Sequence, residues 1–320
     1  MKQRILGKSG ISVSSIGFGA WGIGGAQGDA VAYGKTDDAT SLRALQVSLE
    51  QGVTFYDVAD LYGNGHAEEL LGQAFEHHRD QVVLASKVGF KGFSGERDLS
   101  PAYIEQALAA SLKRLRTDYL DLYQIHSPSD ADFARWPEVL ETLQDLKKRG
   151  LIKAIGLAAK GPDDGLAYLQ THDFDVVQVN FNLADQRAKT NGLFAYCQTH
   201  NIGLIARTPF CFGFLTGKVP SDMKFAPGDH RAKWSAEQIR LWAEAFQRFS
   251  LDAMLGEGQS QAQLALRFCI SYPEVACVIP GTMNEREAVE NASVGDLPLL
   301  AADILDRIET IYKNHLFFAG

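Results

Sequence analysis

Short apolar runs alternate with longer amphipathic stretches along most of this chain. The apolar runs are nearly continuous, which is typical of strands buried on both faces of a parallel sheet. Residues 101–115 begin with a proline and carry apolar side chains every three or four positions, a pattern that predicts a helix. Residues 136–149, which stop at Gly150, and residues 260–270, with Ser260 as an N-cap, predict two more helices. The predicted strands span residues 16–20, 54–59, 82–87, 119–126, 153–158, 176–180, 203–209 and 276–281.

Eight such strand-then-helix units predict an α/β fold of the closed (β/α)8 TIM-barrel type, which takes ~250 residues plus insertions. Residues 2–6 and 11–15 predict an N-terminal β-hairpin at the bottom of the barrel, and residues 301–315 predict an extra C-terminal helix. Residues 210–234 are rich in glycine, proline and aromatic side chains and predict a long loop. No linker or low-complexity tract divides the chain, so residues 1–320 are predicted to form a single domain.

A doubly wound open sheet is the alternative to the barrel. Residues 17–22 read GFGAWG and match the dinucleotide-binding pattern G-x-G-x-x-G. No helix pattern follows them directly, however, and no acidic residue closes a second strand at the distance that this fold requires. The barrel is therefore the favoured architecture.

Composition and charge narrow the classes of function. With 46% hydrophobic and 22% charged residues, the chain has an ordinary globular composition. Its 31 basic and 39 acidic residues give a net charge of −8, which argues against nucleic acid as a main partner. No run of about 18 apolar residues and no signal-peptide core occur, so we expect no membrane partner and a cytoplasmic location. The four cysteines lack metal-site spacing, and no metal site is predicted.

Four polar side chains follow three neighbouring strands of the predicted barrel. Asp57 and Tyr62 come after one strand, and Lys87 and His126 end the next two. In such barrels the active site lies at the carboxyl ends of the strands. A lysine held beside a carboxylate stays charged, and a nearby cation lowers the pKa of a phenol from about 10, which suits Tyr62 to exchange a proton with a carbonyl oxygen. Each residue alone would more often be structural, but together they predict a site that works with a hydride-carrying cofactor.

The same region resembles the aldo-keto reductase superfamily. Residues 55–68 read FYDVADLYGNGHAE and are similar to that family's pattern F-D-T-A-x-x-Y-G-x-G-x-x-E, with Val58 in place of the usual threonine. Residues 112–122, 214–218 and 278–282 agree with later blocks of the family in order and spacing. The resemblance extends over nearly the whole chain and points to bacterial, plain-barrel members with a long loop after strand 7.

The resemblance implies a set of site residues. It makes Tyr62 the general acid, with Asp57, Lys87 and His126 as the other catalytic residues, and it implies that NAD(P)H lies extended across the mouth of the barrel. The implied cofactor-binding residues are Ala20, Trp21, Asp57, Gln178, Arg207, Thr208, Phe210, Gly213, Leu215, Gly217, Lys218, Arg231, Gly281, Thr282, Glu287 and Asn291. The expected substrate pocket contains Trp21, Tyr62, Phe90 and His126.

Two departures from the family pattern concern the nicotinamide end of the site. Ala158 and Ala159 stand where the family often has Ser-Asn, and alanine side chains cannot hydrogen-bond the carboxamide, so Asn180 or another group must compensate. Arg207 replaces the usual stacking tyrosine. A guanidinium stacks well on a ring, but a fixed cation opposes oxidised, cationic nicotinamide more than the neutral reduced form.

The residues expected at the adenosine end of the cofactor do not decide between NADP(H) and NAD(H). Met283 and Glu287 stand where the family often binds a 2′-phosphate, and a glutamate repels phosphate while it accepts readily from a ribose hydroxyl. Arg286 is adjacent and is a candidate substitute. NADP(H) is favoured as the family default, with NAD(H) as the alternative.

The sequence thus predicts an NAD(P)H-dependent oxidoreductase that reduces an aldehyde, ketone or sugar carbonyl to an alcohol. One alternative is an NAD(P)⁺-dependent aldose dehydrogenase that uses the same residues in the opposite direction. Another is a barrel that senses the redox state of its cofactor and turns over slowly. The complete set of four catalytic residues favours an enzyme, while the substrate and the direction of the reaction stay open.

Overall fold

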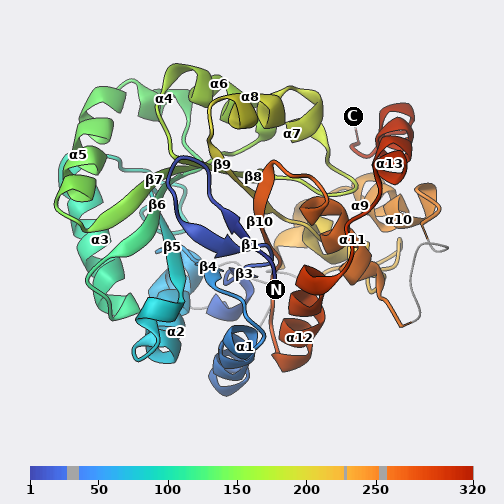
Figure 1. Ribbon diagram of the computed structural model, residues 1–320, viewed down its shortest axis with the longest axis horizontal. Helices are drawn as coiled ribbons and strands as arrows, with labels where there is room; N and C mark the ends of the chain where they lie inside the picture. The colour runs from blue at the N-terminus through green and yellow to red at the C-terminus, as the bar shows by residue number, and fades with distance from the viewer. Residues whose placement is uncertain (27–35, 227–228, 252–257, 320) are drawn as a thin grey trace.

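The computed structural model describes residues 1–26, 36–226, 229–251 and 258–319, and within them eight parallel strands form a barrel inside a ring of helices (Figure 1). The strands follow one another in the order β3 to β10, each paired with the next along the chain. Parallel bridges between Ile16 and Val278 and between Gly19 and Gly281 join the first strand to the last and close the barrel. The predicted (β/α)8 fold is therefore confirmed.

The element bounds lie close to those that the sequence predicts. The barrel strands are β3 (Phe18–Gly19), β4 (Phe55–Asp57), β5 (Val83–Val88), β6 (Leu120–His126), β7 (Ile152–Ala158), β8 (Val176–Asn180), β9 (Gly203–Arg207) and β10 (Val275–Ile279). The helices are α1 (Asp38–Glu50), α2 (His66–Phe75), α3 (Pro101–Leu115), α4 (Asp130–Phe133), α5 (Trp136–Lys148), α6 (Pro162–Thr171), α7 (Arg187–Thr190), α8 (Leu193–Thr199), α9 (Ala236–Ala243), α10 (Ala245–Arg248), α11 (Gln261–Ile270), α12 (Glu285–Ser293) and α13 (Ala302–Asn314). None of these described helices is long and apolar enough to cross a membrane.

Local capping explains where the predicted helices begin. The side chain of Ser100 accepts a hydrogen bond from the backbone of Tyr103 at the start of α3, whose first residue is a proline. At the start of α11, Ser260 and Gln263 cap each other's backbone N–H groups, so the predicted N-cap is confirmed. Both helices then bury their apolar faces against the barrel.

An antiparallel hairpin closes the amino-terminal end of the barrel, as predicted. It consists of β1 (Gln3–Ile5) and β2 (Ser12–Ser14), which lie in front of the strands in Figure 1. Leu6 and Val13 from this hairpin are fully buried in one cluster with inward-facing residues of the barrel strands. Gly7 bridges Ile202, next to the start of β9, which places the hairpin at the end opposite the carboxyl ends of the strands.

Helices α9 and α10 follow the long loop after β9. The strand–helix pattern of the sequence did not predict them. Ser235 caps the start of α9, and Trp242 on that helix contacts Phe318 near the C-terminus at 6.0 Å between ring centroids. Figure 1 shows α9, α10 and α13 together at one side of the barrel. Their position shows that the segment after β9 is an insertion with its own apolar contacts.

We expect the substitution Leu6→Ala to lower the free energy of unfolding by about 2–5 kcal/mol, because it opens a cavity among fully buried barrel residues. Ile5→Ala is the matched control, since Ile5 is 59% exposed and the change should stay within ~0.5 kcal/mol. Urea titration of both variants measures the difference. Equal effects of the two substitutions would show that the hairpin does not seal the barrel core.

Candidate active site

The four predicted catalytic residues lie at the carboxyl ends of adjacent strands. Asp57 ends β4, His126 ends β6, and Lys87 is next to last in β5, while Tyr62 opens a 3₁₀ turn just after β4. The Nζ of Lys87 donates hydrogen bonds to Oδ1 of Asp57 at 2.5 Å, to the carbonyl oxygen of Val58 at 2.9 Å and to the phenol oxygen of Tyr62 at 3.1 Å. All three ammonium protons are thereby used, and one of them points at the phenol.

Buried hydrogen bonds fix the carboxylate that holds Lys87. The Oδ2 of Asp57 accepts from Nε2 of Gln178 at 2.7 Å and from Nε2 of Gln124 at 3.1 Å. Burial alone would lower the pKa of Lys87, but the combined attraction of Asp57 and Tyr62 outweighs it and raises that pKa. Lysine 87 therefore stays an ammonium ion in a site that excludes water.

Gln124 belongs to this network, although it was not among the predicted site residues. It lies two residues before His126 in β6, and alternate residues of a strand face the same side of a sheet. That spacing is the signal by which the sequence could have revealed it. Gly156, opposite Gln124 in β7, makes room for the amide, because a Cβ there would lie 2.7 Å from Cγ of Gln124.

His126 is a neutral imidazole beside the tyrosine. Burial first, and then the positive charges of Lys87, Arg207 and Arg97, hold the pKa of His126 well below its usual range. Its ring lies 6.0 Å from that of Tyr62 and packs against Phe90 at 5.1 Å, both edge to face. A neutral imidazole retains one N–H donor, which suits it to hydrogen-bond a carbonyl oxygen near the phenol.

Close backbone packing fixes the turn that carries Tyr62. Gly63 has φ of 58°, and a Cβ on it would lie 2.3 Å from the carbonyl oxygen of Gly24. Only glycine fits at this contact between two turns. The phenol is therefore positioned by the backbone as well as by its bond to Lys87.

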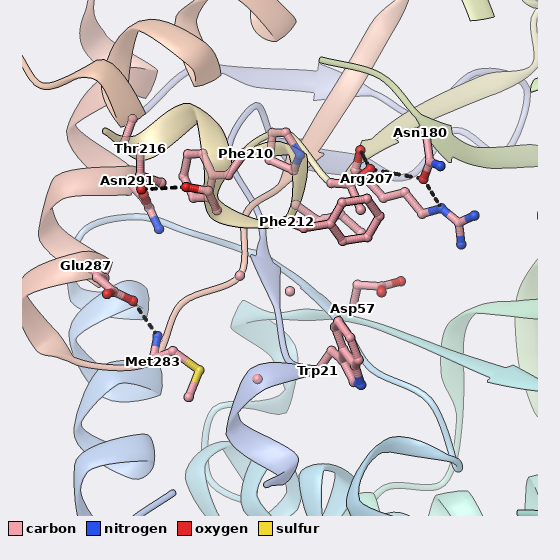
Figure 2. Close-up of a pocket in the computed structure, with 18 of the residues that line it drawn as sticks. Trp21, Asp57, Asn180, Arg207, Phe210, Phe212, Thr216, Met283, Glu287 and Asn291 are labelled. Atoms are coloured by element: carbon pink, nitrogen blue, oxygen red, sulfur yellow. Dashed lines mark hydrogen bonds between the residues drawn. The ribbon is translucent and has the colours of Figure 1, made fainter. Parts of the chain in front are cut away.

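A cavity of about 600 Å³ extends from Asp57 and Tyr62 along the carboxyl ends of β8, β9 and β10, and its lining does not include His126 and Phe90 of the expected substrate pocket. Figure 2 shows Trp21 and Asp57 on one side of it and Glu287 and Asn291 on the opposite side. Predicted cofactor residues that line it are Trp21, Asp57, Gln178, Arg207, Thr208, Phe210, Gly213, Lys218, Arg231, Gly281, Glu287 and Asn291. Lining residues that the prediction missed include Lys160, Asn180, Phe212, Thr216, Met283 and Glu290.

The remaining predicted contacts lie beside this cavity. Ala20, Leu215 and Thr282 are buried behind the lining residues, and Gly217 is exposed. Thr282 still contributes, because its hydroxyl accepts a hydrogen bond of 3.0 Å from Asn291. The direct contacts of these residues with a cofactor stay a prediction.

The lining residues fit a nicotinamide dinucleotide. Aromatic rings of Trp21, Phe210 and Phe212 provide flat apolar surfaces, and the cations of Lys218 and Arg231 suit a pyrophosphate. A cavity of this size, mostly apolar with a few convergent polar groups, is the usual form of a cofactor site. Among the residues that the structure describes, no group of His, Cys, Asp and Glu is placed to hold a metal ion.

Comparison with known proteins agrees with this geometry. The model of the aldo/keto reductase family matches residues 15–313, so the chain belongs to this family. It is an NAD(P)H-dependent oxidoreductase with the family's barrel, and the resemblance drawn from the sequence is confirmed.

Three similar proteins illustrate the range of the family. A probable voltage-gated potassium channel subunit beta of Arabidopsis thaliana is 33% identical over 98% of this chain and 97% of its own. An NADH-specific methylglyoxal reductase of Escherichia coli is 30% identical over 95% and 96%. The solved structure of an aldo-keto reductase from Klebsiella pneumoniae in complex with NADPH has a TM-score of 0.72 and 27% identity, covering 98% of this chain and 95% of that one.

Asp60, two residues before Tyr62, has an unusual environment. Its Oδ1 is buried with no hydrogen-bond partner among the described residues. Burial, and then the nearby charge of Glu68, raise the pKa of Asp60 to about 7. Because an unfolded aspartate loses its proton near pH 3.9, the folded state holds the extra proton between about pH 4 and 7, and the stability from this group is lost as the pH rises through that range.

We expect Asp60→Asn to raise the melting temperature at pH 8 by ~3 °C or more and to have a smaller effect at pH 5, because asparagine imitates the protonated acid. Thermal melts at both pH values test this. The control is Asp222→Asn at an exposed position, which should change neither melt. A gain that is equal at pH 5 and pH 8 would contradict the raised pKa.

Proposed function

We propose that this protein reduces the carbonyl group of a small aldehyde, ketone or sugar with NADPH. The observation that carries the proposal is the phenol of Tyr62, which lines the cavity and accepts a hydrogen bond from the buried ammonium of Lys87. In this position the phenol can donate its proton, because the phenolate that results is stabilised by the fixed positive charge of Lys87. Such an arrangement serves a reaction in which a carbonyl oxygen gains a proton.

The side chains divide the work of one proton transfer. A reduced nicotinamide held among the residues that line the cavity would supply the hydride for the carbonyl carbon. Tyr62 gives the proton of its hydroxyl to the carbonyl oxygen, and the phenolate that remains is stabilised by the ammonium 3.1 Å away. The neutral imidazole of His126 donates its N–H to the same oxygen and orients it, while Asp57 keeps Lys87 in place.

Aromatic walls favour a small, uncharged carbonyl compound. Phe90 packs edge to face on His126, and Trp21 lines the cavity and contacts His230 at 4.7 Å between ring centroids. Flat apolar walls of this kind accept the carbon skeleton of an aldehyde, ketone or sugar. These aromatic walls do not select one of these carbonyl compounds over another.

The alternatives differ from the proposal in direction and rate rather than in residues. An aldose dehydrogenase would use Tyr62 as a base, and a redox sensor would bind the cofactor and turn over slowly. The intact hydrogen bonds between Asp57, Lys87 and Tyr62 support turnover. Initial rates in both directions with a panel of aldehydes, ketones and aldoses separate the three.

NADPH is favoured over NADH by the cations near the adenosine end. Arg286 and Arg43 line an open groove with Asn284, at the start of α12. The Glu287 carboxylate is turned to the backbone, because its Oε2 accepts from the N–H of Met283 at 2.9 Å. Two solved structures of aldo-keto reductases from Klebsiella pneumoniae, in complex with NADPH and with NADP, and an NADP(+) aldo-keto reductase of Schizosaccharomyces pombe support the same preference, whereas the E. coli relative is NADH-specific.

We expect Tyr62→Phe to lower the rate of carbonyl reduction by roughly 10²–10⁴-fold, because it removes the transferred proton, while NADPH still binds. Steady-state rates with the best carbonyl found in the panel, together with a fluorescence titration of NADPH, measure the two effects. Tyr196→Phe, away from the cavity, is the control and should keep the wild-type rate. Turnover near the wild-type level in Tyr62→Phe would remove this residue from the mechanism.

For the cofactor preference, we expect Arg286→Met to raise the Kd of NADPH by roughly three- to tenfold and to leave that of NADH unchanged, since only NADPH carries the additional phosphate. The matched control is Arg43→Met, because Arg43 is already paired with Glu50 and Glu285. Its effect on NADPH should be smaller. Parallel weakening of both cofactors in Arg286→Met would contradict the assignment.

A further inference from the structure

Arg207, at the end of β9, is a half-buried cation in the active-site cavity that lacks a carboxylate partner among the described residues. Its Nε donates to Oδ1 of Asn180 at 2.8 Å, and its Nη2 donates to the carbonyl oxygens of Ala159 at 2.7 Å and Lys160 at 3.2 Å. All three acceptors are neutral. Figure 2 shows the guanidinium extended beside Asn180.

Several other partly buried arginines of this chain are neutralised by a carboxylate, whereas Arg4, at the other end of the barrel, donates to backbone carbonyl oxygens. Arg79 pairs with Asp121 and Arg97 pairs with Asp132, each at 2.7 Å. Arg231, which lines the same cavity as Arg207, pairs with Asp229 at 2.7 Å. Of these two arginines that line the cavity, Arg231 has a carboxylate partner and Arg207 is held by neutral acceptors.

The other charges near the reacting groups cancel or are absent. Lys87 is paired with Asp57, and His126 is neutral because its pKa is depressed. Burial lowers the pKa of Arg207, yet a guanidinium is not deprotonated in proteins, so it keeps its charge. Arg207 thus supplies a partly buried positive charge at this end of the cavity, where the other lining cation, Lys160, is exposed to solvent.

The side chain of Arg207 makes polar contacts at the carboxyl ends of two neighbouring strands, β7 and β8. Its hydrogen bonds fix the backbone at Ala159 and Lys160, directly after β7, where the side chain of Ala159 has no polar group. They also fix Asn180, whose Oδ1 accepts from Thr208 at 3.0 Å as well. These bonds use Nε and Nη2 of Arg207, so the two N–H groups on Nη1 are available to donate to a bound molecule.

We infer that Arg207 makes the protein bind reduced nicotinamide cofactor more tightly than oxidised cofactor. The inference rests on the proposed function, because it concerns the cofactor of that site. Reduction of nicotinamide removes its positive charge, so an unneutralised guanidinium in the same cavity repels only the oxidised ring. The planar guanidinium can meanwhile stack on the neutral ring.

This discrimination affects both the release and the redox potential of the cofactor. Oxidised cofactor leaves more readily after each reduction, and the bound couple becomes easier to reduce than the free couple. A tenfold ratio of dissociation constants corresponds to ~30 mV for a two-electron couple. Arg207 therefore favours loading of the site with reduced cofactor and release of the oxidised form, while it makes the bound reduced cofactor a weaker hydride donor.

The test is the ratio of the Kd for NADP⁺ to the Kd for NADPH, measured by isothermal calorimetry without substrate. We expect Arg207→Met to lower this ratio by about tenfold, because the repulsive charge is gone. Arg207→Lys should keep most of the ratio while both forms bind more weakly, since the charge remains and the forked hydrogen bonds are lost. Arg207→Gln replaces the methionine variant if its thermal melt shows that it does not fold.

Arg231→Met serves as the matched control, because it removes a cation of the same cavity that is already paired with Asp229. It should weaken NADP⁺ and NADPH in equal proportion. If Arg207→Met also weakens both forms equally, Arg207 only supports the backbone and the inference is overturned. Failure of the wild-type protein to bind either form would instead overturn the proposed function, and the inference with it.

Discussion

The active site depends on one buried ion pair, that between Lys87 and Asp57. The two charges are stable in the barrel interior because Val58, Tyr62, Gln124 and Gln178 add hydrogen bonds to those that the ion pair makes itself. This requirement ties four strands to a single carboxylate. The position of the Tyr62 phenol follows from that arrangement, and the charge of Lys87 adds to the burial that keeps His126 neutral.

Much of this site could be predicted because it lies at strand ends, where polar residues interrupt apolar runs. Asp57, Lys87 and His126 are visible in that way, and a TIM barrel brings such positions together. The acceptors of Arg207 were not predictable, since two of them are backbone carbonyls, which carry no signature in residue type. Helices α9 and α10 were not predicted, because they lie outside the strand–helix alternation from which the other elements were identified.

The structure also explains how this chain departs from its family without losing the cofactor site. The two alanines after β7 and the arginine after β9 are contiguous in space, joined by the hydrogen bond from Arg207 to the Ala159 carbonyl. At this strand end the polar contact is made by a backbone carbonyl and a side chain from another strand, without a polar side chain at residues 158 and 159.

The hairpin formed by β1 and β2 determines from which end small molecules reach the reacting groups. Leu6 and Val13 pack with inward-facing residues of the barrel strands, so the described part of the barrel interior is filled from its amino-terminal end. The cavity lies at the opposite end, along the carboxyl ends of the strands. Small molecules therefore reach Tyr62 from the side of the loops that follow the strands.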